Sequence, residues 1–377
     1  MAVIEATWLR PLADHVDDDE AAISVYLDLS PAATPTPGDL ASRVSSVHDT
    51  LGRLGAGRSP AARKRLEAGA GRVAAFLESE DLRGGGEVHG AAIFAQADET
   101  FTAAPLWRSA GELTTTGRRF VLRPAAALAS RTNDVLLVEA GRELGRVIAF
   151  DHGRMIDVAD ADEHIANRHR KGGRSQPRYQ RDLDRQAEVH MAEVAAIVER
   201  LHEPLDRPPI VIAATEEHAA TFRERMSEPV AGSVIGVLGN ARDMGAAQLH
   251  DELRRLADEH DVAREQALLD RCAEQLGREE VAGGLEGVLD AAYTGRIETL
   301  LIARGASPDV FTCPQCGRLG AEARVCPYDE TFMQHEPDGV EAAVSATLRA
   351  DATVWELIDP DCRDLDAAGG LGPIVRY

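Results

Sequence analysis

The chain has 377 residues, of which 44% are hydrophobic and 28% charged, and its formal net charge is −22. This length gives room for two or three domains, and this composition excludes an intrinsically disordered chain. No apolar run reaches the eighteen or so residues of a membrane span, and no basic segment followed by an apolar one begins the chain. We therefore expect a cytoplasmic protein without a membrane partner.

Residues 1–125 are predicted to form one α/β domain. The run "AISVYLDLS" has strand composition, and "TPTPGD" breaks it. Apolar residues then recur every three or four positions, which indicates two helices. The strands are expected at 22–30, in a pair within 87–107, and at 118–124; the helices are expected at 39–55 and 60–79. Residues 124–134 resemble a linker.

Residues 133–242 are predicted to form a second domain. Three β-rich runs within 134–158 are separated by "AGRELG" and "DHGR", which are natural hairpin turns. After a basic stretch, an apolar stripe predicts a helix from about 180 to 202. A strand at 208–215, a helix from 216 and a strand at 234–239 are expected to follow.

Residues 245–377 are predicted to form a third domain, so the expected fold class is α/β with three domains. A long helix is expected to 277, then a helix, a turn at Gly295 and the strand "ETLLIA". A cysteine-containing insertion at 311–333 precedes a helix at 339–350 and a last strand, "TVWELI". Strands that alternate with helices along the whole chain are typical of α/β domains.

The insertion "CPQCGRLGAEARVCPYDE" has the spacing of a zinc ribbon. Two tight turns, each offering two ligands, surround a tetrahedral ion in such sites. The second turn has one cysteine, so Asp329 is the candidate fourth ligand and His335 a weaker alternative. The predicted structural zinc site consists of Cys313, Cys316, Cys326 and Asp329. The alternative is a former zinc ribbon that lost a ligand and folds without metal.

The stretch "NRHRKGGRSQPRYQRD" (167–182) concentrates positive charge in an acidic chain. Between residues 168 and 185, seven basic and two acidic residues give a local charge of +5, which leaves −27 on the rest. Arginine pairs with phosphates through two hydrogen bonds, and aromatic rings stack on unpaired bases. The candidate RNA-contacting residues are Arg168, His169, Arg170, Lys171, Arg174, Arg178, Tyr179 and Arg181. On charge alone, a solvated arginine-rich loop is the alternative.

The order of these elements resembles the archaeo-eukaryotic release factor and Pelota superfamily, specifically its bacterial branch. The resemblance rests on "ISVYLDLS", on "LLVEAGRELGRVIAFDHGRMIDV" with the basic stretch, on "GVLDAAYTGRIETLLIARG" and on the cysteine turns. These stretches span all three predicted domains. The resemblance implies a central domain with a ribonuclease-H-like sheet, whose loop reaches the peptidyl-transferase centre from the ribosomal A site.

The glycines of the loop differ from those of release factors. Release factors have Gly-Gly-Gln at the tip, whereas here Arg174 and Ser175 separate Gly173 from Gln176. The sequence is similar to the looser Gly-x-x-Gln of the Vms-type peptidyl-tRNA hydrolases, and the whole chain resembles the Balon-like hibernation factors. If the protein is a hydrolase, the resemblance implies that Gly172, Gly173 and Gln176 carry the activity.

Two functions follow from this resemblance. The first is a hibernation factor that occupies the A site and contacts rRNA without chemistry. The second is a peptidyl-tRNA hydrolase that rescues stalled ribosomes and acts on P-site tRNA. Both imply the ribosome as partner, with a translational GTPase such as EF-Tu as a further partner and with no DNA partner.

Overall fold

The computed structural model describes residues 6–79, 88–97, 100–140, 145–151, 154–160, 176–278, 283–360 and 362–376. Helices and strands alternate through most of it, which confirms the predicted α/β class. Its contacts group the chain into two compact units. One unit contains residues 1–131 and 264–377, and the other contains residues 132–263. The division into three domains stays a prediction.

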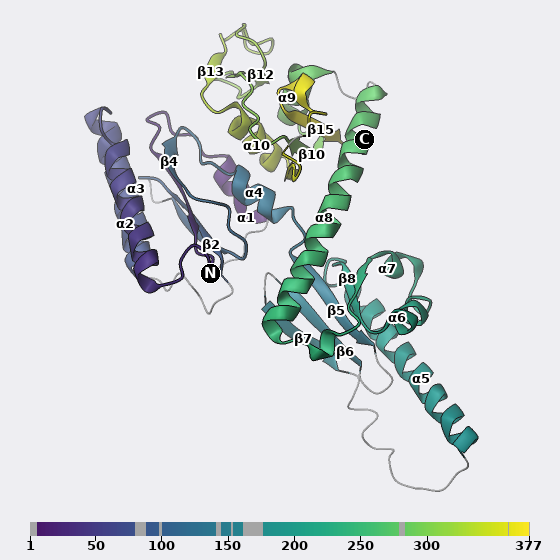
Figure 1. Cartoon of the computed structure of the whole chain (residues 1–377). Helices are drawn as coiled ribbons and strands as arrows, with labels where there is room; N and C mark the ends of the chain where they lie inside the picture. The colour runs from purple at the N-terminus through teal and green to yellow at the C-terminus, as the bar shows by residue number, and fades with distance from the viewer. Residues whose placement is uncertain are drawn as a thin grey trace. The chain divides into compact units, whose positions relative to one another are not determined.

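A four-stranded antiparallel sheet forms the N-terminal part of the first unit (Figure 1). Its strand order is β3-β2-β1-β4. Side chains alternate across β1, so Ile23 and Val25 pack against helices α2 and α3, while Tyr26 faces the opposite core. The elements are α1 (Ala6–Ala13), β1 (Ala22–Asp28), α2 (Pro37–Leu54), α3 (Pro60–Ser79), β2 (Gly90–Ala95), β3 (Phe101–Leu106), β4 (Leu113–Gly117) and α4 (Arg123–Ala129).

The C-terminal part of the first unit is built on the sheet β14-β10-β15. Strand β10 lies in the middle, parallel to β14 and antiparallel to β15. A second small sheet has the strand order β12-β11-β13. The first cysteine turn connects β11 to β12, and the second lies between β12 and β13. The elements are α9 (Gly284–Tyr293), β10 (Ile297–Ile302), β11 (Val310–Thr312), β12 (Leu319–Gly320), β13 (Gln334–Glu336), α10 (Gly339–Arg349), β14 (Thr353–Glu356), η3 (Asp366–Ala368) and β15 (Leu371–Val375).

Helix α10 is buried along nearly its whole length between the two parts of the first unit. One hydrophobic core contains Phe94 and Phe120 of the N-terminal part together with Val340 and Val344 of α10. The fully buried Glu341 lies in this core. Its carboxyl group accepts hydrogen bonds from the N–H groups of Leu122 (2.8 Å) and Arg123 (3.1 Å) at the start of α4.

The second unit is a five-stranded sheet of order β7-β6-β5-β8-β9. Strands β5, β6 and β7 are antiparallel, and β8 and β9 continue parallel to β5. This is the ribonuclease-H-like arrangement that the resemblance implied. Helices α5 and α6 cover one face, and the first half of α8 covers the other. The elements are β5 (Asp134–Ala140), β6 (Gly145–Asp151), β7 (Arg154–Asp160), α5 (Gln176–His202), β8 (Ile210–Ala213), α6 (Glu216–Arg223), α7 (Glu228–Gly232), β9 (Val234–Val237), η2 (Ala241–Asp243) and α8 (Ala246–Gly277), and the residues of α8 from Arg264 onward belong to the first unit.

Three local predictions are wrong. The strand expected at 118–124 lies earlier, at Leu113–Gly117, where β-branched threonines favour it. The expected linker contains α4, because alanines favour a helix and Glu341 satisfies its first N–H groups. The last strand is β15 rather than β14; it is an edge strand, a position in which Pro373 is tolerated.

No helix among the described residues is both long enough and apolar enough to cross a bilayer.

Burial of Glu341 predicts a pH-dependent stability. Burial, and then the nearby charge of Asp338, raise the pKa of the Glu341 carboxyl from 4.5 to about 8. Between these pH values the folded protein therefore holds one more proton than the unfolded chain. The free energy of unfolding should fall as the pH rises through this window, by up to about 1.4 kcal/mol per pH unit from this group.

Glu341→Gln imitates the protonated carboxyl, so this variant should gain stability relative to wild type as the pH rises from about 5 to about 8. Urea unfolding at several pH values measures the difference. Exposed Glu322→Gln is the control and should follow the wild-type curve. Parallel curves for wild type and Glu341→Gln would contradict the assignment.

Candidate functional site

The four predicted metal ligands lie together in the structure. One ligand atom from each of Cys313, Cys316, Cys326 and Asp329 lies within 4.8 Å of all the others. The Cys313 Sγ is 3.2 Å from Asp329 Oδ2, and the sulfur atoms of Cys316 and Cys326 are 3.6 Å apart. Tetrahedral zinc with bonds of about 2.0–2.3 Å needs similar separations between its ligands.

The two turns that carry these ligands have the same backbone geometry. In the first, Gly317 N–H donates to Cys313 O (2.9 Å) and Cys313 N–H donates to Arg318 O (2.8 Å). In the second, Glu330 N–H donates to Cys326 O (3.0 Å) and Cys326 N–H donates to Thr331 O (2.8 Å). Asp329 thus occupies, in the second turn, the place that a cysteine occupies in the first.

The residue after the last ligand of each turn has a left-handed conformation. Gly317 has φ 77° and Glu330 has φ 59°. Glycine adopts this conformation without strain, whereas a glutamate adopts it at a cost of about 1 kcal/mol. The second turn therefore has the shape of the first, although Asp329 stands in the place of Cys316 and Glu330 in the place of Gly317.

The chemistry of the four groups suits a closed, structural site. Cys313 and Cys326 are buried, and Cys316 and Asp329 are half-buried. The Cys316 thiol, followed by the Thr331 N–H, lowers the pKa of the Asp329 carboxyl and favours its ionised, metal-binding form. Thiolates are among the ligands that suit zinc, and a carboxylate is an acceptable fourth zinc ligand. The weaker alternative, His335, is exposed on β13, 3.6 Å from Asp309, outside this group of ligands.

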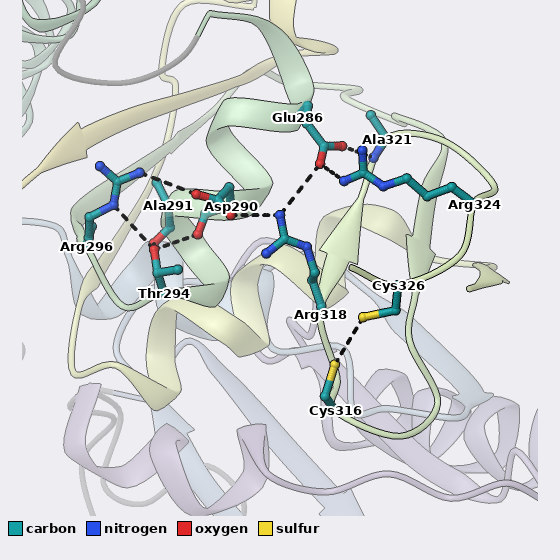
Figure 2. Close-up of polar contacts among 10 residues, drawn as sticks. All are labelled: Glu286, Asp290, Ala291, Thr294, Arg296, Cys316, Arg318, Ala321, Arg324 and Cys326. Carbon is teal, nitrogen blue, oxygen red and sulfur yellow. Dashed lines mark hydrogen bonds and ion pairs between the residues drawn. The ribbon is translucent and has the colours of Figure 1, made fainter. Parts of the chain in front are cut away.

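Helix α9 holds the cysteine turns through a set of acid–arginine contacts (Figure 2). The Glu286 carboxylate accepts hydrogen bonds from the Ala321 N–H (2.8 Å) and from the Arg324 guanidinium. One turn further along the helix, Asp290 is 2.9 Å from the guanidinium of Arg318. These contacts fix the segment that carries the cysteine turns to helix α9.

Sequence reasoning did not identify this set of contacts. Glu286 and Asp290 are four residues apart on one face of α9, and like charges at this spacing repel unless cations from elsewhere pair with them. Their arginine partners lie in the insertion some thirty residues later, where spacing gives no cue.

Most of the predicted RNA-contacting segment lies outside the described residues. This applies to Arg168, His169, Arg170, Lys171, Gly172, Gly173 and Arg174. The backbone of Gln176, Arg178, Tyr179 and Arg181 is described and belongs to α5. The helix expected from about residue 180 therefore begins at Gln176.

The central part of the chain matches a known protein family. Residues 131–296 match the model of bacterial archaeo-eukaryotic release factor family 3. This match confirms the resemblance to the bacterial branch of the superfamily. No curated protein matches the chain.

The chain is also similar to solved structures of low sequence identity. A crystal structure of the archaeal translation termination factor aRF1 is 13% identical, with 99% of this chain and 97% of that chain covered and a TM-score of 0.26. Pelota of Archaeoglobus fulgidus is 15% identical over 76% of this chain and 79% of its own, with a TM-score of 0.35. Dom34 of S. cerevisiae is 10% identical over 74% of each chain, with a TM-score of 0.40.

The four candidate ligands predict one bound metal ion per chain, and we expect this ion to be zinc. Cys313→Ala/Cys316→Ala should abolish binding because it removes half of the ligands, and Asp329→Ala should weaken it. Asp329→Cys should bind zinc more tightly than wild type, because the second turn already has the geometry of the first. Elemental analysis and competition with a chelator measure this series, and a folded wild type without metal would contradict it.

The acid–arginine contacts predict a local loss of stability in Glu286→Gln. The variant weakens the contacts to Arg324 and the Ala321 N–H, at a cost of about 1–3 kcal/mol. Amide hydrogen exchange should accelerate within 313–333 and stay unchanged in β1 and β2. Glu322→Gln, on the same insertion but exposed, is the matched control. Equal exchange in both variants would show that Glu286 does not hold the insertion.

Proposed function

Because residues 131–296 match a bacterial release factor family, we propose that this protein is a ribosome-associated translation factor. That match carries the proposal. The matched region contains the whole basic segment 167–182 and the ribonuclease-H-like sheet from which it extends. We propose that the segment enters the ribosomal A site and reaches the peptidyl-transferase centre. We also propose that the protein acts in the cytoplasm.

The distribution of charge supports a contact with RNA that is confined to this segment. Residues 168–185 carry +5, and the rest of the chain carries −27. Phosphates repel the acidic remainder and attract the segment, and salt screens both effects beyond about 10 Å. Binding to rRNA should therefore depend on the segment alone and should weaken with salt.

The position of Gln176 supports occupation of the A site rather than catalysis. Two residues separate Gln176 from Gly173, and Gln176 is already the first residue of α5. A glutamine at a helix start is placed differently from one that directly follows two glycines at a loop tip. We therefore propose a hibernation factor that blocks the A site and protects the catalytic centre of idle ribosomes.

A peptidyl-tRNA hydrolase is the second candidate. The spacing Gly173-Arg174-Ser175-Gln176 supports it, since the Vms-type hydrolases share Gly-x-x-Gln. In this case Gln176 would orient the water that attacks the ester of P-site peptidyl-tRNA, and the tRNA 3′ hydroxyl would leave. In either function, we expect delivery by a translational GTPase such as EF-Tu and a structural zinc ion in the cysteine turns.

One experiment separates the two functions. Ribosomes that carry P-site peptidyl-tRNA are mixed with wild type or Gln176→Ala, and both sedimentation with ribosomes and ester cleavage are measured. We expect binding without cleavage, and equal binding of the variant. Cleavage that depends on Gln176 would establish the hydrolase instead.

The contact with RNA is tested by Arg170→Gln/Lys171→Gln. Loss of two phosphate contacts should weaken ribosome binding several-fold and lower its salt dependence by about one to two counterions. Arg53→Gln/Lys64→Gln changes the net charge equally at two exposed positions of α2 and α3, and it should bind like wild type. Failure of the wild type to bind ribosomes at low salt would overturn the proposed function.

A further inference from the structure

Three large apolar side chains are exposed on the second cysteine turn. Val325 is 54% exposed, Tyr328 65% and Phe332 61%. Val325 and Phe332 are opposite each other in an antiparallel bridge, and Tyr328 lies in the turn between them. We call these three residues the turn face. Exposed apolar side chains that gather in one short segment indicate a binding surface, whereas single ones do not.

Contacts beneath the turn face hold part of it in place. The Tyr328 ring lies 4.9 Å from the Arg318 guanidinium and 6.1 Å from the Tyr293 ring. Arg318 is itself almost buried and is paired with Asp290 (Figure 2). A side chain that is already ordered loses little conformational entropy when a partner binds, so Tyr328 suits an anchoring role.

The charges around the turn face are negative. Glu322 and Glu330 are exposed on the same segment, while the nearby Arg324 is paired with Glu286. A divalent ion bound by three thiolates and one carboxylate would leave a net charge of −2 on the site. This environment repels phosphates and attracts lysine and arginine side chains.

We propose that the turn face binds a basic protein surface, in which an apolar side chain packs against Tyr328 and Phe332 and flanking Lys or Arg residues pair with Glu322 and Glu330. Aromatic rings could equally stack on RNA bases, but the RNA-binding surfaces that use them also supply positive charge. The charge of the turn face therefore favours protein. This inference deepens the proposed function, because we place the partner surface on the ribosome.

The test uses the full-length chain and measures its affinity for ribosomes. Glu322→Lys/Glu330→Lys should bind about tenfold more weakly than wild type if the partner is a basic protein, and more tightly if the partner is RNA. Asp49→Lys/Glu78→Lys makes the same change in net charge at exposed positions on α2 and α3 and serves as the control. Tyr328→Ser/Phe332→Ser should also weaken binding about tenfold. Unchanged zinc content and thermal stability verify that each variant is folded.

The chemical class of the partner is read directly by cross-linking. A photoreactive benzoylphenylalanine at position 328 should cross-link to a protein, at a peptide that contains Lys or Arg. A cross-link to rRNA, tighter binding of Glu322→Lys/Glu330→Lys, or wild-type affinity in both double variants would each overturn the inference while the proposed function stands. If wild type does not bind ribosomes, the proposed function fails and this inference fails with it.

Discussion

The carboxyl group of Glu341 joins two parts of the first unit that are far apart in the sequence. Helix α4 begins at Arg123, and the preceding Leu122 has no side chain that caps the helix. Buried N–H groups at a helix start need an acceptor, and Glu341 of α10 provides it. Val340 and Val344 of α10 then share one hydrophobic core with Phe94 and Phe120 of the N-terminal part. The C-terminal sheet and its cysteine turns therefore fold together with the N-terminal sheet, which is why residues 264–377 belong to the same unit as residues 1–131.

Elements that depend on local sequence could be predicted. The hairpins of β5, β6 and β7 follow from their turns, and the stripe of α5 places Met191, Val194 and Val198 in the core as expected. Elements that depend on distant partners could not. An alanine-rich segment becomes α4 because the carboxyl group of Glu341, more than two hundred residues later, accepts hydrogen bonds from its first N–H groups. Strand β15 contains a glycine and a proline that argue against a strand.

The candidate metal site likewise has one part that could be predicted from the sequence and one part that could not. Its four ligands were predictable because two turns of similar sequence place them locally, and the structure brings all four together. The support from Glu286 and Asp290 was not predictable, since nothing in their spacing indicates Arg318 or Arg324. The basic segment stays a prediction, because residues 161–175 lie outside the described part of the chain.

In the proposed function, the separation of charge allows the protein to make two different contacts with the ribosome. Outside residues 168–185 the chain has a net charge of −27, so orientations that bring residues 168–185 against phosphates are favoured over the others on average. A second contact must then be made with a partner that tolerates or requires negative charge. The turn face meets this condition, because the nearby Arg318 and Arg324 are paired with acids of α9, while Glu322 and Glu330 on the same segment are exposed. The pairing of α9 with the cysteine turns thus neutralises Arg318 and Arg324, which leaves negative charge around the proposed binding surface.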